Sequence, residues 1–315
     1  MSYAQGGEIQ ASDLNTFIGT NPTTTANTIN TVWAIGGSAA GYGQTAVPIV
    51  AVGDEIYASN WGNLITKTSN VALHQGSSIT SVSAPVVGAE VTYVSAIPTN
   101  LSTIYSNRLN AATQGSTNAN TQTYGSTWSN SLTFTFTATF ANGDAARYFF
   151  NSGGQFAMTC SHPSGAGINA TVSQLASNIG TVVMSAPSSG TATISSTPYT
   201  GITKVGGGGN TPSPYLTNNG YFALTTANAN VFTQTASGSS YLGTNIKFLV
   251  KSNGTQGTNG DAGSIVTIYC VWAEVPAGTA ITSGSTTTLT LRPPETTYIA
   301  NTWGAVTLSG AVTGS

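Results

Sequence analysis

The segment Leu132–Phe140, which reads LTFTFTATF, decides the fold class of this chain. Apolar residues at 132, 134, 136, 138 and 140 alternate with threonines at 133, 135, 137 and 139. Successive side chains of a strand point to opposite faces, so this period of two predicts a β-strand with one buried and one polar face. Asn142-Gly143 follows, a dipeptide typical of a tight hairpin turn. We therefore predict an antiparallel sheet that starts here.

The residues beyond this turn predict two further strands of a meander, with Arg147–Phe150 as the second, Gly153-Gly154 as a turn and Gln155–Cys160 as the third. A helical period appears only at Ile168–Ile179, and Gly180 is placed to end that helix. Many short strands at this spacing predict a β-sandwich, in which Ile265–Val275, apolar on both faces, is a central strand. The other predicted strands are Thr181–Ser185, Thr191–Ser195, Tyr221–Thr225, Val231–Ala236, Asn245–Lys251, Ser264–Val275 and Thr286–Arg292.

The first part of the chain predicts short helices and carries an internal repeat. Glu8–Ser12 (EIQAS) recurs as Glu55–Ser59 (EIYAS), and each copy places a serine where a helix N-cap is favoured. Val87–Val91 echoes the start of the second copy and precedes a helix predicted near Thr99–Ala112. Such short units cannot bury their apolar faces alone, so we expect them to pack on one another or on a neighbouring subunit. Chance similarity of small residues is the alternative.

These patterns predict an α+β, mainly β fold: a short-helix N-terminal region followed by an antiparallel β-sandwich. We place a helical, repeat-containing anchoring region at residues 1–115 and the β-sandwich domain at residues 128–315. Residues 116–127 show no periodicity, which predicts a linker between the two.

Composition excludes several functional classes. The chain has 315 residues with 7 Lys+Arg and 9 Asp+Glu, a net charge of −2, and only 5% charged residues, against about 25% in an average domain. No basic cluster is present, so we expect no nucleic acid partner. No apolar run approaches ~18 residues, and the start at Met1–Gly6 resembles no secretory signal, so we expect no membrane insertion. A net charge near zero promotes association, which favours a homo-oligomer.

Residues that could carry catalysis are scarce and scattered. His74 and His162 are the only imidazoles, and neither lies in a hydrolase motif. We interpret Cys160 near His162 as a buried cysteine and a turn histidine rather than a nucleophile with its base. The loop 253–261 offers oxygen ligands but the single carboxylate of Asp261, so we interpret it as a glycine-rich connection rather than a calcium site. We therefore expect no enzyme, no cofactor and no metal.

Several stretches resemble a known family. They are Ile9–Asn15 leading to Gly41–Gln44, Gly53–Trp61 ending at His74–Gly76, Asp144–Gln155, Phe232–Ser237 and Leu289–Pro293. Over roughly residues 5–295 the chain resembles a family of tailed-bacteriophage virion structural proteins, and RYFFNSGG at 147–154 is the most specific part. The resemblance implies a location in the virion and transfers no catalytic residue. Acidic residues are associated with the stretch before the last strands in that family, whereas Val275–Thr279 is neutral, which puts any contact made there in doubt.

The expected function is a non-enzymatic structural component of a tailed-phage virion, at the neck or collar, the baseplate or a fibre. Its expected partners are copies of itself and other virion proteins. The alternative is a host-receptor-binding tail fibre or adhesin module that grips a surface glycan or protein. Exposed aromatics are expected to stack on sugars in that case, namely Tyr215, Tyr221, Tyr241 and Trp303. A secreted adhesin and a hydrolytic tail enzyme are further rivals.

The candidate site residues serve packing or docking. Trp33, Trp61 and Leu64 are the candidates in the helical region. In the predicted hairpin, Arg147 is expected to pair locally with Asp144. The rest of the motif either holds the core or presents an aromatic to a neighbouring subunit; it comprises Tyr148, Phe149 and Phe150, with Gly153 and Gly154 free to adopt positive φ in a turn.

Overall fold

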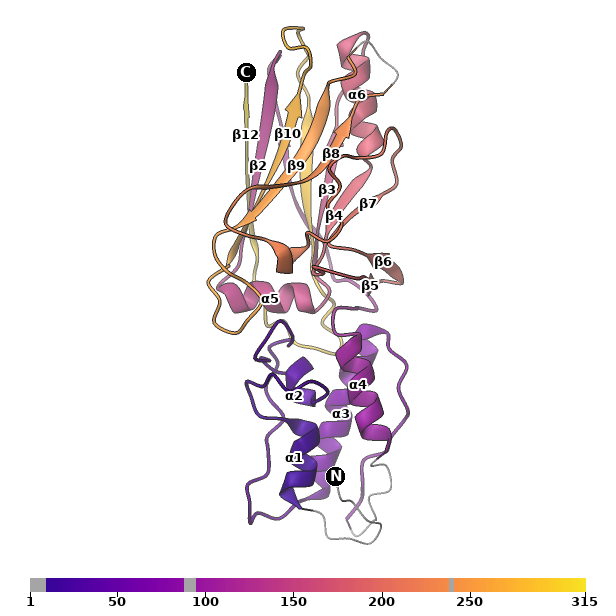
Figure 1. Ribbon diagram of the computed structural model, residues 1–315, viewed down its shortest axis with the longest axis vertical. Coiled ribbons are helices and arrows are strands. Elements are labelled where there is room, and N and C mark those ends of the chain that lie inside the picture. The colour runs from indigo at the N-terminus through magenta and orange to yellow at the C-terminus, as the bar shows by residue number, and fades with distance from the viewer. Residues whose placement is uncertain (1–9, 88–94, 238–240) are drawn as a thin grey trace.

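The computed structural model of the chain describes residues 10–87, 95–237 and 241–315. The molecule is elongated, with helices gathered at one end and a β-sandwich at the other (Figure 1). The fold is thus α+β and mainly β, as predicted, with antiparallel sheets. Glu8 and Ile9 of the first repeat and residues 88–91 of its later echo lie outside the described residues.

Two five-stranded antiparallel sheets form the sandwich. The first sheet has the order β1 (Asn118–Thr123), β11 (Thr286–Arg292), β3 (Gln155–Ser161), β4 (Thr181–Met184) and β7 (Ile202–Val205). The second has the order β12 (Thr307–Gly314), β2 (Ser131–Thr139), β10 (Ile265–Ala273), β9 (Asn245–Ser252) and β8 (Ala229–Thr235). A small hairpin of β5 (Ala192–Ile194) and β6 (Thr197–Tyr199) packs on the first sheet through Ala157 and Val183.

Strand β2 confirms the alternation from which the fold was predicted. Its apolar side chains are buried, while its threonines lie on the outer face. Strand β10 pairs with β2 on one side and β9 on the other, so it is central in its sheet, as expected. Its outer face is half-buried rather than buried, because no layer of the sandwich covers that side of the sheet.

The helix α6 (Ile168–Ile179) has the predicted bounds, and Gly180 follows it with a φ of 63°. The helix α5 (Gly143–Asn151), in contrast, replaces the predicted hairpin turn and the predicted strand Arg147–Phe150. Asn142 is an N-cap rather than a turn residue, since its Oδ1 accepts the backbone N–H of Ala145 at 2.8 Å. The predicted three-stranded meander is therefore wrong, and β3 instead pairs with β11 and β4.

Two further predicted segments differ in the structure. Residues 118–123 of the predicted linker form β1, which pairs with β11 along its whole length and joins it by hydroxyl contacts such as Thr121 Oγ1 to Thr288 Oγ1 at 2.9 Å. The predicted strand Tyr221–Thr225 begins instead with the 3-10 helix η1 (Tyr221–Ala223).

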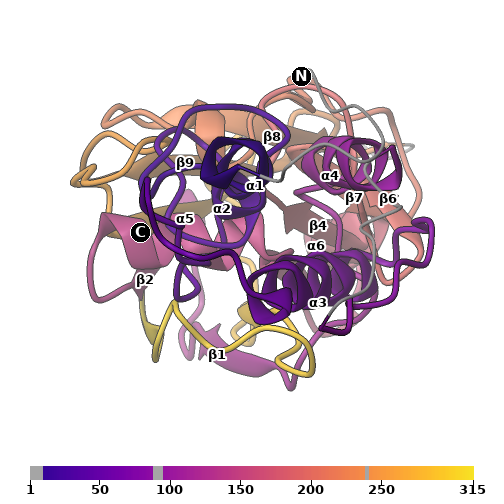
Figure 2. The ribbon, with the colours of Figure 1, turned by 90° about the horizontal axis from the view of Figure 1, so that it is seen from below.

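The helical end contains α1 (Ala11–Ile18), α2 (Ile29–Val32), α3 (Ala58–Gln75) and α4 (Ala96–Ser106), and Figure 2 shows α1, α3 and α4 from below. Both repeat copies start a helix at the same position, but the serines lie inside the first turn and are not the N-caps. The residue after each serine does the capping: Asp13 accepts the backbone N–H of Gln10 at 3.0 Å, and Asn60 that of Tyr57 at 2.8 Å.

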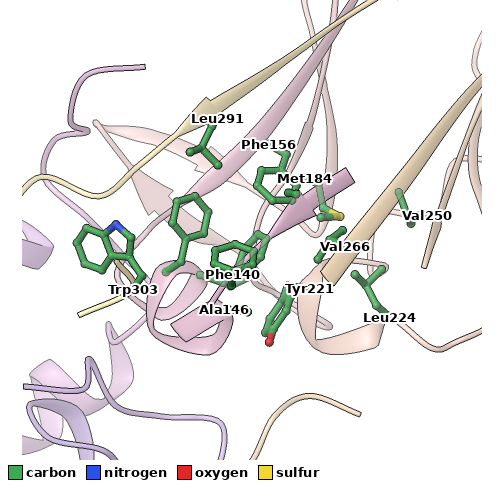
Figure 3. Packing of buried hydrophobic residues seen from close by; sticks show 14 of the residues in the cluster. Phe140, Ala146, Phe156, Met184, Tyr221, Leu224, Val250, Val266, Leu291 and Trp303 are labelled. Carbon is green, nitrogen blue, oxygen red and sulfur yellow. The ribbon is translucent and has the colours of Figure 1, made fainter. Parts of the chain in front are cut away.

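One contiguous hydrophobic core runs through both regions. At the base of the sandwich it is aromatic, with Phe150 stacked on Tyr221 at 4.3 Å between ring centroids and Phe149 edge-on to Phe150 at 5.1 Å. Figure 3 shows Phe140, Phe156 and Tyr221 in this cluster beside Trp303. The helical region and the sandwich are therefore packed as one body rather than joined by a free linker.

Candidate functional site

The junction between the two regions is built around α5, which lies across the base of the sandwich (Figure 1). Arg147 on this helix is 1% exposed, and its Nη1 donates to three backbone carbonyls of the helical region. The acceptors and distances are Ile35 O at 2.8 Å, Ser38 O at 3.1 Å and Ala40 O at 2.6 Å. A guanidinium supplies five donors in a fixed plane, so one side chain can fix the whole turn 35–40.

Asp144, one helical turn earlier, completes the environment of Arg147. Its Oδ1 accepts from Nη2 at 3.0 Å and from Nε at 3.3 Å, so the expected local pair forms, although on a helix. The same carboxylate accepts the backbone N–H of Gly260 at 3.2 Å, which attaches the loop 253–261 to α5. In that loop Asp261 accepts from Thr258 N at 2.8 Å and thereby closes the turn on itself.

Two neighbours of Arg147 extend the contact. Asn151 Nδ2 donates to Gly41 O at 2.9 Å. The ring of Tyr148 lies so close to Gly43 that a Cβ on that glycine would fall 2.4 Å from it. Gly43 also has a φ of 69°, so both its space and its backbone require glycine. We call Arg147, Tyr148 and Asn151 the α5 clamp, because together they hold residues 35–43 against the sandwich.

The chain crosses the junction a second time after β11. The side-chain amide of Gln44 binds both backbone groups of Ala300, as the backbone of a neighbouring strand would. Its Nε2 donates to Ala300 O at 2.9 Å, and its Oε1 accepts the Ala300 N–H at 2.9 Å. Thr302 Oγ1 donates to Tyr42 O at 2.6 Å. The segment after β11 is thus bound to the helical region before the chain returns to form β12.

His74 lies inside this junction rather than in an accessible site. Its Nε2 is 3.0 Å from Ser152 O, and its ring meets Tyr42 edge-on at 5.3 Å. Burial lowers the pKa of His74 to about 4, so the imidazole is neutral at pH 7 and donates to the carbonyl. Burial likewise raises the pKa of Tyr42. Neither group is placed to exchange protons with a substrate.

The structure places the candidate residues of the sequence inside the chain. Trp33, Trp61 and Leu64 are buried in the helical region, and Phe149 and Phe150 are buried in the aromatic core. Tyr148 is only 9% exposed, so none of the three aromatics of the motif is the exposed one that docking requires. These side chains contact their own chain, so they offer no surface to a neighbouring subunit.

The two glycines after α5 are required by close approach. Gly153 has a φ of 93°, and a Cβ there would lie 2.4 Å from Ala111 Cβ. A Cβ on Gly154 would lie 2.4 Å from the ring of Phe149. The predicted turn is therefore present, but it connects α5 to β3 rather than two strands.

The aromatics expected to stack on sugars are not free for that role. Tyr221 and Trp303 are buried, so the expectation that they are exposed is wrong. Tyr215 is half-buried; its hydroxyl accepts the backbone N–H of Lys204 at 2.7 Å, and its ring meets Phe232 edge-on. Tyr241 packs against the core.

Cys160 and His162 do not contact one another as a nucleophile and its base would. Cys160 Sγ lies 3.7 Å from Cys270 Sγ, a contact between the two sheets, and both cysteines are free thiols. Burial raises the pKa of Cys160, which disfavours the reactive thiolate. His162 contacts Ser285 Oγ at 3.0 Å and Asn169 Oδ1 at 3.3 Å instead of the cysteine. Across residues 10–87, 95–237 and 241–315, no group of three His, Cys, Asp or Glu could hold a metal ion.

Sequence reasoning missed Glu274, which is 3% exposed. Its carboxylate accepts the backbone N–H of Gly278 and of Thr279, each at 2.9 Å. The neutral stretch 275–279 is therefore folded around an acidic residue that immediately precedes it. A lone glutamate gives no signal of this in a sequence, because the partners are backbone groups.

No family model, curated protein or solved structure matches this chain. In the part that the structure describes, no helix is both long and apolar enough to cross a membrane.

A groove of about 560 Å³ opens beside the junction, on the side of α3. Its lining includes Trp33, Thr45, Asn63, Lys67, Asn70 and Tyr298. The two segments that cross the junction form part of the groove's walls, because residues 44–48 and 298 and 300 line it. Neither the periodicity nor the motifs of the sequence indicate it, since its walls come from three distant segments.

Proposed function

We propose that this chain is a non-enzymatic structural subunit of a tailed-phage virion, associated with the tail, that assembles with copies of itself and with other virion proteins. The observation that carries the proposal is the α5 clamp. Arg147 lies buried at the junction and binds three carbonyls of the helical region and the carboxylate of Asp144. The residues of the motif that resembles the virion family thus join the two regions into one elongated body.

The surface of the sandwich supports assembly through uncharged contacts. One edge strand of each sheet, β1 in the first and β12 in the second, contains no charged residue, and these two strands lie beside one another. Charges on edge strands normally prevent unwanted pairing between chains, so uncharged edges favour association. Such edges suit a protein that packs among copies of itself.

The free end of the helical region supports an anchoring role. Val52 is 99% exposed and Tyr57 is 60% exposed, and both line a groove of about 690 Å³ between the starts of α1 and α3. Asp54 and Glu55 line the same groove. Apolar side chains with a charged rim are typical of protein interfaces, and this rim favours a basic partner over a second copy of the same acidic end.

The experiment is immunoelectron microscopy of intact phage particles with an antibody against this chain. Label at the neck, the baseplate or the fibres supports a structural role in the virion. Label on no particle overturns it. A paired comparison tests the anchor: particles complemented with Val52→Asp should lack the protein, whereas particles complemented with Val205→Asp, at an exposed position of β7, should carry it. Equal incorporation of both variants contradicts anchoring through this end.

Receptor binding is the second candidate function, and one observation favours it. The groove beside α3 holds Lys67, whose ammonium has no carboxylate partner among the residues that the structure describes. A concave site with an unpaired cation and several polar side chains is typical of a ligand site.

A further inference from the structure

Three polar side chains of α3 face the groove in a row. Asn63, Lys67 and Asn70 are spaced four and three residues apart, which places them on one side of the helix. Within the described residues, the two amides form no hydrogen bond, and the Lys67 ammonium forms neither a hydrogen bond nor an ion pair but lies 4.8 Å from the centroid of the Trp33 ring. The helix thus presents donors and acceptors that the chain itself does not use.

Aromatic side chains and a single positive charge complete the groove. Trp33 forms part of the wall beneath Lys67, and Tyr298, which is 39% exposed, belongs to the opposite segment. No carboxylate lines the groove, although the chain as a whole has a net charge of −2. The groove is therefore locally positive and selects for an anionic ligand.

The backbone of the walls is already bonded at Thr45, Val47 and Ala300, which leaves less of it for a peptide and favours a sugar. Asn30 holds Val47 through both its backbone groups, at 2.8 and 2.9 Å. Thr45 O accepts from Trp33 Nε1 at 2.8 Å, and Ala300 is paired with Gln44. A peptide that added itself as a strand would need such backbone groups to be free. The side chains of the groove supply amides, hydroxyls and one ammonium, which match a polyol with a carboxylate. These same bonds fix the walls before a ligand arrives, so little ordering is needed on binding.

We propose that this groove binds a carboxylate-bearing sugar of a glycan, with Lys67 contacting the carboxylate and Asn63 and Asn70 contacting the ring hydroxyls. Tyr298 covers one face of the sugar. The inference gives a ligand class to the second candidate function. It does not depend on a place in the virion, because it is measured on the purified chain.

The test is a titration of the full chain, followed by calorimetry and by ligand-observed saturation-transfer NMR. The probes are trigalacturonic acid and sialyllactose, with the full methyl ester of each as its neutral counterpart. We expect saturable binding of an acidic sugar and binding at least about tenfold weaker for its neutral counterpart, because the charge-assisted bond is lost. Absence of saturable binding by both acidic sugars overturns the proposal.

Variants separate the site from general charge effects. Lys67→Met keeps the aliphatic stem over Trp33 and should weaken binding about tenfold or more. Lys247→Met, on the outer face of β9, removes the same charge elsewhere and should leave binding within about twofold. Equal weakening by both variants overturns the proposal, as does an acidic peptide that binds as tightly as the sugar and depends equally on Lys67. Circular dichroism and thermal melting establish that each variant is folded.

Discussion

Replacing Arg147 with methionine tests whether the α5 clamp joins the two regions. Methionine keeps the apolar stem and removes all the donors of the guanidinium. Ile35 and Ser38 are partly exposed, so water can replace the donor at their carbonyls, but Ala40 is 1% exposed and its carbonyl loses its 2.6 Å hydrogen bond. An unsatisfied buried acceptor costs about 1–3 kcal/mol. Removing one partner of a buried ion pair costs about 3–5 kcal/mol, and Asp144 at 25% exposure belongs near the lower limit.

We therefore expect Arg147→Met to lower the free energy of unfolding by about 4 kcal/mol. Urea unfolding followed by circular dichroism measures this loss, and Lys247→Met is the matched control, with an expected change below about 0.5 kcal/mol because it lies on the open face of β9. Hydrogen exchange should show the largest loss of protection at residues 35–44, where the backbone N–H groups of Tyr42 and Gly43 are bonded within the helical region. A loss below about 1 kcal/mol, or unchanged protection at 35–44, would refute the role given to Arg147.

Three further predictions concern buried groups. The pKa of His74 is about 4 in the folded chain against an ordinary 6.5, so the unfolded chain takes up the proton first, and the free energy of unfolding falls by about 3 kcal/mol as the pH drops from 6.5 towards 4. His74→Gln should remove that fall when urea unfolding is measured at several pH values. An identical pH profile for both proteins would contradict the prediction. Gly43→Ala should lower the free energy of unfolding by about 3 kcal/mol and Gly53→Ala by only about 1 kcal/mol, as measured by urea unfolding. Both glycines have positive φ, but only Gly43 meets an aromatic ring. Similar losses would count against the close contact. Cys160 and Cys270 should resist iodoacetamide in the native chain and react with it in denaturant, because Cys270 is buried and burial raises the pKa of Cys160. Mass spectrometry of the labelled chain measures both reactions. Rapid labelling of Cys160 in the native chain would contradict the prediction.

Elements with a periodic pattern could be predicted from the sequence. Strand β2 shows the period of two that one buried face requires. Helix α6 shows a helical period, and Gly180 marks its end, so even its bounds were predicted. The sandwich followed from such strands, because period and spacing are local properties of the chain.

Helix α5 was missed although Asp144, Arg147 and Asn151 are spaced three and four residues apart, as one side of a helix requires. Its nine residues are too few for this period to stand out, and the aromatic run YFF favours a strand by propensity. The available signal was Asn142 with Asp144 behind it, a helix start that is also compatible with a turn. Strand β1 was missed for another reason: NANTQT is polar on both faces, and only its pairing with β11 makes it a strand.

In the candidate site, too, the residues of a local motif could be predicted, whereas contacts between distant segments could not. The specific motif around Arg147 was found, but its partners are carbonyls at 35–40, which have no residue identity to detect. The groove at Lys67 was missed because residues 33, 67 and 298 are far apart in the chain. Local sequence therefore indicates which residues are unusual, and only the fold shows what they contact.

The internal use of the motif bears on what the family resemblance can imply. Arg147 and Asn151 bind the helical region, Phe149 and Phe150 fill the core, and Gly153 fits against Ala111. A chain that keeps these residues keeps the rigid junction, whatever it assembles with, because none of them reaches the surface. If the proposed function holds, exposed features must determine which partners the chain binds. The free end of the helical region, where apolar side chains lie beside Asp54 and Glu55, serves attachment, and the groove on α3 serves recognition. Substitutions there should change partners without changing the shape of the molecule.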